Sequence, residues 1–203
     1  MNDTKIIIIS SPSGAGKTTI CNKILKKNKD IKLSVSYTTR PKRKGEIDGI
    51  DYFFINKEAF IKLKKINFFI ETAKVFDHLY GSPNINIQKN YKKNKKILFD
   101  IDWQGAQELR KKFSSRDIID FFILPPSKKE LELRLKKRAR ENKNEIKKRL
   151  SLAVKEMKHY NEYKYVIIND NIDTTVTNVL KIIQYENLLY LIEKKVNLLK
   201  FIK

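Results

Sequence analysis

The chain has 203 residues, of which 41% are hydrophobic, and its formal net charge is +21. This length suits one hydrophobic core, with room for small inserted subdomains. No stretch approaches the roughly 18 uncharged apolar residues of a membrane-spanning helix, and the N-terminus lacks a signal-peptide pattern. We therefore expect a cytoplasmic protein without a membrane partner. The single cysteine, Cys21, excludes an internal disulfide and is expected to be a small packing residue.

The positive charge raises the possibility of nucleic-acid binding. It is spread along the chain as lysine pairs such as Lys26-Lys27, Lys92-Lys93 and Lys194-Lys195. No aromatic residues are interleaved with these lysines in the manner of an RNA-binding motif. We therefore expect most of the charge to be solvated surface, a minority to serve anionic nucleotides, and no specific nucleic-acid partner.

Residues 6–19 have the organisation of a phosphate-binding loop. The β-branched run Ile6–Ile9 predicts a strand buried on both faces, and apolar residues recur at helical spacing after the loop. Gly14 and Gly16 let the backbone turn its N–H groups inward, and the helix N-terminus adds partial positive charge. Strand, small-residue loop and helix together predict a nucleotide site.

In such a loop Lys17 is expected to reach the β- and γ-phosphates of a nucleotide, and the Thr18 hydroxyl to bind Mg²⁺. A chance Gly-x-Gly-Lys in an ordinary strand–turn–helix is the alternative, which the Lys-Thr pair at the helix start disfavours. Ser11 replaces the first glycine of the full pattern. The residues expected to contact ATP here are Ser11, Pro12, Ser13, Gly14, Ala15, Gly16, Lys17, Thr18 and Thr19.

Strand-like and helix-like segments alternate along the rest of the chain. We expect strands at residues 32–36, 52–55, 68–76, 96–102, 118–124 and 165–168. We expect helices at residues 56–63, 85–91, 103–112, from Ser127 onwards, at 145–160, and one or two over 174–202. Glycine and proline mark residues 37–46 and 79–83 as loops. This alternation predicts an α/β fold with a largely parallel sheet, with a more β-rich insertion from Arg40 to about Ile87.

Three features outside the loop also indicate phosphate chemistry. The apolar strand 96–102 ends in carboxylates, and P-loop enzymes hold Mg²⁺ at such an aspartate, directly or through water. Residues 40–44 carry four cations in five positions, which predicts an anion-binding loop. Glu71 lies in an otherwise apolar strand, and because a buried unpaired carboxylate is costly, it is expected to be functional.

Several stretches together closely resemble the signature of guanylate kinases, and of the bacterial single-domain type most. They are Ser34–Arg40, Arg43–Glu46, Gly49–Tyr52 with Phe54, Asp100–Gly105, Phe122–Ser127, Arg138, Arg149 and Ile168–Asp170. The resemblance covers nearly the whole chain as one domain, residues 1–203. It implies a P-loop NTPase-type parallel sheet core with helices on both faces (1–36, 94–135, 160–203), an inserted mixed α/β GMP-binding subdomain (about 37–93) and a helical lid (about 136–159).

The resemblance also implies how GMP is bound. Arg40 and Arg43 match arginines that hold the GMP phosphate, and Glu71 and Ser82 match the residues that read guanine. A carboxylate accepts from guanine N1–H and its amino group, whereas adenine has no N1–H, so AMP is expected to be rejected. The complete implied GMP set is Ser36, Arg40, Arg43, Tyr52, Glu71, Tyr80, Ser82 and Asp102.

For ATP, the resemblance implies that Arg138 and Arg149 belong to a mobile lid that neutralises the transferring phosphoryl group. Asn169 and Asp170 match positions near the adenine. The implied reaction is ATP + GMP giving ADP + GDP with Mg²⁺, also with dGMP, in purine nucleotide metabolism. No general base is needed, because the acceptor is already an ionised phosphate. The implied catalytic residues are Lys17, Arg43, Asp100, Arg138 and Arg149, and the metal ligands are Thr18 and Asp100.

Other interpretations stay open at the level of sequence. They are a guanylate-kinase-like binding module without activity, a nucleic-acid-binding protein, and a kinase for another monophosphate. Retention of Lys17, Arg40 and Glu71 disfavours the first. Ala139 stands where the family commonly has glycine after the lid arginine, which would stiffen the lid hinge. Arg134 is expected to lie either in the lid or on a solvated helix face. The chain is expected to be a monomer or a homodimer.

Overall fold

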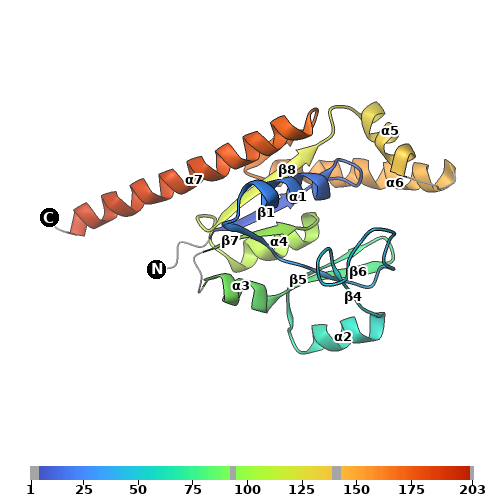
Figure 1. Cartoon of the computed structure of the whole chain (residues 1–203), viewed down its shortest axis with the longest axis horizontal. Coiled ribbons are helices and arrows are strands. Elements are labelled where there is room, and N and C mark those ends of the chain that lie inside the picture. Colours follow the sequence, from blue (N-terminus) through green and yellow to red (C-terminus); the bar gives the residue numbers. More distant parts are fainter. Residues whose placement is uncertain (1–4, 92–94, 139–142, 202–203) are drawn as a thin grey trace.

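The core of the molecule is a five-stranded parallel sheet (Figure 1). The computed structural model describes residues 5–91, 95–138 and 143–201, with side chains for 5–87, 95–136 and 148–192. In order across the sheet the strands are β2 (Ile31–Leu33), β7 (Lys96–Asp100), β1 (Ile6–Ser10), β8 (Ile118–Leu124) and β9 (Tyr165–Ile168). The α/β fold with a parallel sheet is confirmed.

Strand β1 lies at the centre of this sheet and is covered on both faces. Alternate side chains of a strand point to opposite faces. Ile7 and Ile9 accordingly pack with residues of α1 (Lys17–Lys27) and α7 (Ile172–Phe201). Ile6 and Ile8 pack with residues of α4 (Trp103–Lys112) on the other face. All four isoleucines have no exposed surface, which explains the unbroken apolar run in the sequence.

A second, smaller sheet is built from the β-rich insertion. Its order is β4 (Phe53–Phe54), β3 (Tyr37–Thr38), β6 (His78–Pro83) and β5 (Phe69–Val75). Helix α2 (Lys57–Lys65) begins at Asn56, whose side chain accepts a hydrogen bond from the Ala59 N–H at 2.8 Å. This is the helix start that the sequence predicts.

Two segments of this sheet differ from the prediction. Residues 79–83, predicted as a loop, belong to β6, which pairs with both β3 and β5. Pro83 is tolerated because it ends the strand, where a missing N–H interrupts no further pairing. The strand predicted at 32–36 ends at Leu33, because the chain crosses there from the core sheet to the second sheet, where residues predicted as loop form β3.

The remaining helices are α3 (Asn84–Tyr91), α5 (Lys128–Arg138) and α6 (Lys143–Met157), followed by a 3₁₀ turn, η1 (Lys158–Glu162). The Ser127 hydroxyl accepts from the Glu130 N–H at 3.1 Å, as the capping pattern predicts. The helix predicted at 145–160 gives way to the 3₁₀ turn after Met157, and α7 is one continuous helix. Within the described ranges no helix combines the length and apolarity needed to span a bilayer. Figure 1 shows α5 and α6 together at one end of the core sheet.

Candidate active site

A cleft of about 480 Å³ lies at the carboxyl ends of β1 and β7, bounded by the loop after β1, the second sheet and α6. This edge of a parallel sheet is the usual ligand position in open α/β folds. Sixteen of the predicted site residues, from five separate parts of the sequence, line it. They are Ser11, Pro12, Ser13, Gly14, Gly16, Lys17, Thr18, Ser36, Arg40, Arg43, Tyr52, Glu71, Tyr80, Asp100, Asp102 and Arg149.

The other predicted residues whose side chains the structure describes do not line this cleft. Ala15 and Ser82 are fully buried, and Thr19 and Asp170 are exposed. The Arg138 side chain and Ala139 lie outside the described residues, so the structure does not bear on the lid arginine or its hinge.

Asn169 supports the phosphate-binding loop through a hydrogen bond to the loop backbone. Its Nδ2 donates to the Ala15 carbonyl at 2.8 Å, and its Oδ1 accepts from the Thr175 hydroxyl at 3.1 Å. Gly16 adopts a φ of 97°, and a Cβ there would lie 2.8 Å from Asn169 Nδ2. The loop therefore needs glycine at this position for both its backbone conformation and its contact with Asn169.

Lys17 and Asp100 form an ion pair at the centre of the cleft. The Lys17 Nζ lies 2.5 Å from Asp100 Oδ1 and donates to the Ile101 carbonyl at 2.9 Å. Burial opposes the charged form of Lys17, but the neighbouring carboxylate outweighs it and raises the pKa of Lys17. Lys17 is thus an ammonium at the point where the loop, β7 and the cleft meet.

Thr18 and Asp100 also provide oxygen donors suited to Mg²⁺. Asp100 Oδ1 is buried and has no hydrogen-bond donor besides its ion pair with Lys17 in the described part of the chain. Among the described residues no group of three or more His, Cys, Asp or Glu is placed to hold a metal. Mg²⁺ commonly takes only one or two protein oxygens and completes its shell with phosphates and water. The donor set therefore fits a nucleotide-bound Mg²⁺.

Two arginines face the cleft from the opposite side. Arg40, 8% exposed, holds Glu46 with two hydrogen bonds, Nη1 to Oε2 at 3.1 Å and Nη2 to Oε1 at 2.7 Å. Its guanidinium lies 5.5 Å from the Tyr52 ring centroid. Desolvation and the Arg40 charge lower the pKa of Arg43. An anion placed here would stabilise both guanidinium groups.

Glu71 presents a buried acceptor from β5. It is 2% exposed, and its Oε1 has no hydrogen-bond partner among the described residues. Burial raises the pKa of Glu71 to about 7. Ser82 lies opposite it across the β5–β6 pair, and the Ser82 hydroxyl lies 3.0 Å from that of Ser36. A ligand that supplies N–H donors would satisfy this carboxylate.

Asp102 lines the cleft and also begins α4. Its Oδ1 accepts from the Gly105 N–H at 3.1 Å, and its Oδ2 accepts from Gln104 Nε2 at 2.7 Å. It is therefore the N-cap of α4, held by hydrogen bonds on both oxygens.

Two site contacts were not anticipated from the sequence. Glu156 of α6 lines the cleft, its Oε2 accepts from the Ser13 N–H at 3.0 Å, and burial raises its pKa. A glutamate on an amphipathic helix carries no sequence signal that separates it from a solvated residue. Arg134 contacts Glu130 at 2.8 Å and donates to the Asn169 carbonyl at 3.2 Å, so it supports the loop region.

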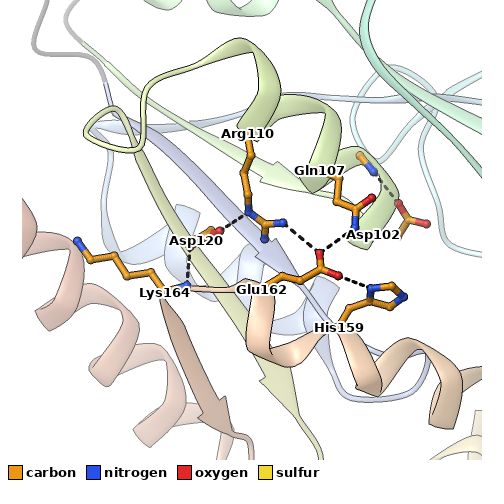
Figure 2. A network of polar contacts seen from close by, with 8 residues as sticks. Asp102, Gln107, Arg110, Asp120, His159, Glu162 and Lys164 are labelled. Carbon is orange, nitrogen blue, oxygen red and sulfur yellow. Dashed lines mark hydrogen bonds and ion pairs between the residues drawn. The ribbon is translucent and has the colours of Figure 1, made fainter.

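The turn that follows α6 is fixed to α4 by a polar network (Figure 2). The His159 ring stacks on Trp103 with 3.8 Å between ring centroids, and its Nδ1 lies 2.5 Å from Glu162 Oε1. Glu162 Oε2 accepts from Gln107 at 2.9 Å and lies 3.4 Å from Arg110 Nη1. These contacts hold the carboxyl end of the α6 region at a fixed place on the core.

Comparison with known proteins identifies what the chain is similar to. A family model described as guanylate kinase matches residues 3–186. The guanylate kinase of Zymomonas mobilis subsp. mobilis is 46% identical over 183 residues, covering 90% of this chain and 84% of that protein. That of Bradyrhizobium diazoefficiens is 41% identical over 198 residues, covering 98% and 89%. The crystal structure of guanylate kinase from Anaplasma phagocytophilum superposes with a TM-score of 0.77 at 35% identity, covering 92% of this chain and 88% of that chain.

Proposed function

Because the chain belongs to the guanylate kinase family, it transfers the γ-phosphoryl group of ATP to GMP, and we propose that the cleft described above is where this transfer takes place. The observation that carries the proposal is the meeting of Lys17, the Arg40–Arg43 pair and the buried Glu71 in one cavity. Such a site offers cations for two sets of phosphates and one acceptor for a base.

For ATP, we propose that the loop Ser11–Thr19 holds the phosphates with its backbone N–H groups and Lys17. Thr18 and Asp100, the latter directly or through water, are the proposed Mg²⁺ ligands. The ion, when bound, neutralises charge on the transferred group. We propose that Asn169 and Asp170 lie at the adenine end, where the hydrogen bond from Asn169 to the Ala15 carbonyl would link base binding to the loop.

For GMP, we propose that Arg40 and Arg43 bind the phosphate, helped by the hydroxyls of Ser36, Tyr52 and Tyr80. Glu71 and Ser82 are the proposed guanine readers, and Asp102 is proposed to support the base end of the site. The unsatisfied Oε1 of Glu71 supports this, because guanine brings N1–H and amino donors to it and adenine does not. The deoxyribose analogue dGMP presents the same base and phosphate and is a further proposed acceptor.

The lid completes the proposed site. We propose that residues 136–159 close over ATP, and that Arg138 and Arg149 then neutralise the transferring phosphoryl group. In the same proposal the core comprises residues 1–36, 94–135 and 160–203, and the GMP-binding insertion comprises about 37–93. Arg149 supports this by lining the cleft from α6. Positioning and charge neutralisation suffice, because the attacking phosphate oxygen is already ionised. We further propose a cytoplasmic monomer or homodimer with no nucleic-acid or membrane partner.

The assignment is tested by measuring ADP formation from ATP and Mg²⁺ with GMP, AMP, UMP and dTMP as acceptors. We expect GMP to be preferred by several orders of magnitude over AMP. Preferred turnover of another monophosphate would keep the fold and overturn the guanine assignment. Absence of turnover with every acceptor, in folded protein, would favour a binding module.

Replacing Arg43 with alanine tests the phosphate site separately. Loss of one charge-assisted contact predicts a KM for GMP about 10- to 100-fold higher. The KM for ATP and the melting temperature should not change, because it is the Arg43 backbone N–H that bonds Glu46, at 2.7 Å. Lys42→Ala, one residue away in the same exposed loop, is the matched control and should leave the KM for GMP near wild type. Equal effects of both changes would indicate only a general electrostatic attraction.

Replacing Glu156 with glutamine tests the contact between α6 and the loop. The Glu156 carboxylate accepts a hydrogen bond from the Ser13 N–H, which lies in the loop proposed to bind the phosphates of ATP. The carboxylate is also negatively charged, as ATP is. We expect Glu156→Gln to lower the Kd for ATP by about 3- to 10-fold, as removal of a like charge would. Isothermal titration measures this, with Glu132→Gln on α5 as control, a partly exposed glutamate paired with Lys136 at 2.7 Å. Weaker ATP binding would instead mean that Glu156 supports the loop in its binding conformation.

A further inference from the structure

Helix α4 of the core runs along β5, which is the edge strand of the second sheet. Backbone groups of alternate residues on an edge strand point to its open side and need partners. Three α4 side chains, spaced four residues apart on one helix face, supply them. They are Gln104 Nε2 to the Lys74 carbonyl at 3.0 Å, Glu108 Oε2 from the Thr72 N–H at 3.0 Å, and Lys112 Nζ to the Ile70 carbonyl.

We call these three side chains the α4 ladder. They satisfy the backbone of β5 at positions 70, 72 and 74, on either side of Glu71. The ladder therefore fixes the depth and register at which β5 lies on the core. Glu71, on the same strand, is placed relative to α4 by these hydrogen bonds.

Gly105 of α4 lies directly against the Glu71 side chain. A Cβ at position 105 would lie 2.4 Å from Glu71 Oε2 and 3.0 Å from its Cδ. The next nearest atom, Ile101 Cδ1, would be 3.3 Å away and lies at the end of a flexible side chain. Glycine makes an α-helix less stable than alanine does. Helix stability therefore does not explain this residue, whereas the Glu71 carboxylate does.

The Glu71 carboxylate borders the cleft, so displacement from position 105 would push it into the space proposed for guanine. Glu71 is 2% exposed, and the strand that carries it is held by the ladder on one side and by β6 on the other. The Gly105 N–H is itself bonded to Asp102, so the backbone at 105 is also fixed. Any side chain at position 105 must displace the carboxylate of Glu71 from its present position.

We propose that Gly105 is a positioning residue for guanine recognition. By lacking a side chain it leaves the room in which the Glu71 carboxylate sits, while the α4 ladder holds β5 at the matching depth. The inference rests on the proposed role of Glu71 in reading GMP and assigns to α4 the control of where that carboxylate lies.

The variant Gly105→Ala tests this in the full-length protein. We expect the KM for GMP to rise at least tenfold, with the preference for GMP over AMP falling by a similar factor. The KM for ATP should stay within about twofold. The melting temperature should fall only slightly, because the substitution displaces a single side chain. A merely structural role would instead lower the melting temperature and change both KM values together.

A second background separates steric displacement of Glu71 from other effects. In Glu71→Ala the carboxylate is gone, so adding Gly105→Ala should change the KM for GMP no further. A further tenfold rise in that background would overturn the proposal. The ladder is tested by Glu108→Ala, expected to raise the KM for GMP several-fold, and by Glu108→Gln, whose amide oxygen can still accept from Thr72 and should restore it.

Failure of the proposed function is distinguishable from failure of this inference. If the wild-type protein does not use GMP, guanine recognition itself is wrong. The position of Glu71 is then tested by measuring the free energy of unfolding at pH 5.5 and 8.0. Burial raises the pKa of Glu71 to about 7, so the difference between the two values reports on how deeply the carboxylate is buried. Gly105→Ala should reduce the pH dependence that Glu71 contributes. An unchanged dependence would show that Gly105 does not control the carboxylate.

Discussion

Replacement of Lys17 by alanine is expected to lower kcat for GMP phosphorylation by about 10³-fold, comparable with loss of one preorganised charge at a transition state. Lys17 is the cation at the junction of the loop, β7 and the cleft. The change also leaves Asp100 without its partner. Because the two side chains are 20% and 13% exposed, the loss of stability should be below the roughly 3–5 kcal/mol of a fully buried pair.

Two further variants separate catalysis from folding in this experiment. Lys23→Ala removes the same chemical group from the same helix, but its ion pair with Asp173 is exposed, at 39% and 66%. It should cost less than about 1 kcal/mol and leave kcat unchanged. The double variant Lys17→Ala with Asp100→Asn should recover stability without recovering activity. Wild-type turnover in folded Lys17→Ala would contradict the proposed role of the loop lysine.

The core of the fold could be predicted because its determinants are local. The run Ile6–Ile9 has the composition of a central buried strand, and the residues after it have the conformational needs of a phosphate-binding loop. Asp100 follows from the same reasoning, since it ends the neighbouring strand. The strand β6 was missed because Gly81 and Pro83 are turn residues in isolation, and pairing with two strands overrides that preference.

The parts of the site that escaped prediction depend on contacts distant in sequence. Glu156 reaches Ser13 across 143 positions, and nothing in its helical surroundings distinguishes it from solvated glutamates. Asn169 was expected near the adenine, but its hydrogen bond to the Ala15 carbonyl, 154 positions away, was not predicted. In the sequence, Gly105 is only a residue that destabilises a helix. The reason for a glycine there becomes visible when the fold places Glu71 of β5 beside it. A residue type can be interpreted from its neighbours in sequence, but its partner comes only with the fold.

Replacement of Glu71 by glutamine is expected to reduce kcat/KM for GMP by about 10²-fold or more, because a site built around a hydrogen bond penalises its mismatch. The amide keeps the size of the carboxylate but replaces one of its two acceptor oxygens with an NH₂ donor, which then faces a guanine donor. In the wild-type protein the KM for GMP should also rise as the pH falls below about 7, since protonation removes the acceptor. The GMP phosphate takes up a proton near pH 6 as well. Comparison with the variant, which shares only the second effect, separates the two.

The same substitution should stabilise the free protein at high pH, which follows from the direction of the pKa shift. Burial raises the pKa of Glu71 from 4.5 to about 7, so between these values the folded state binds more protons than the unfolded state. The free energy of unfolding therefore falls as the pH rises through that window, by roughly 3 kcal/mol in total at pH 8. Glu71→Gln removes this penalty, and its melting temperature should exceed that of the wild type by at least about 3 °C at pH 8 but not at pH 4.5. The exposed Glu58→Gln should show no such difference. A variant that gains no stability at pH 8 would mean that the Glu71 carboxylate is already satisfied without a ligand. A gain of stability together with a loss of GMP turnover would show that the carboxylate is retained for base recognition at the expense of folding.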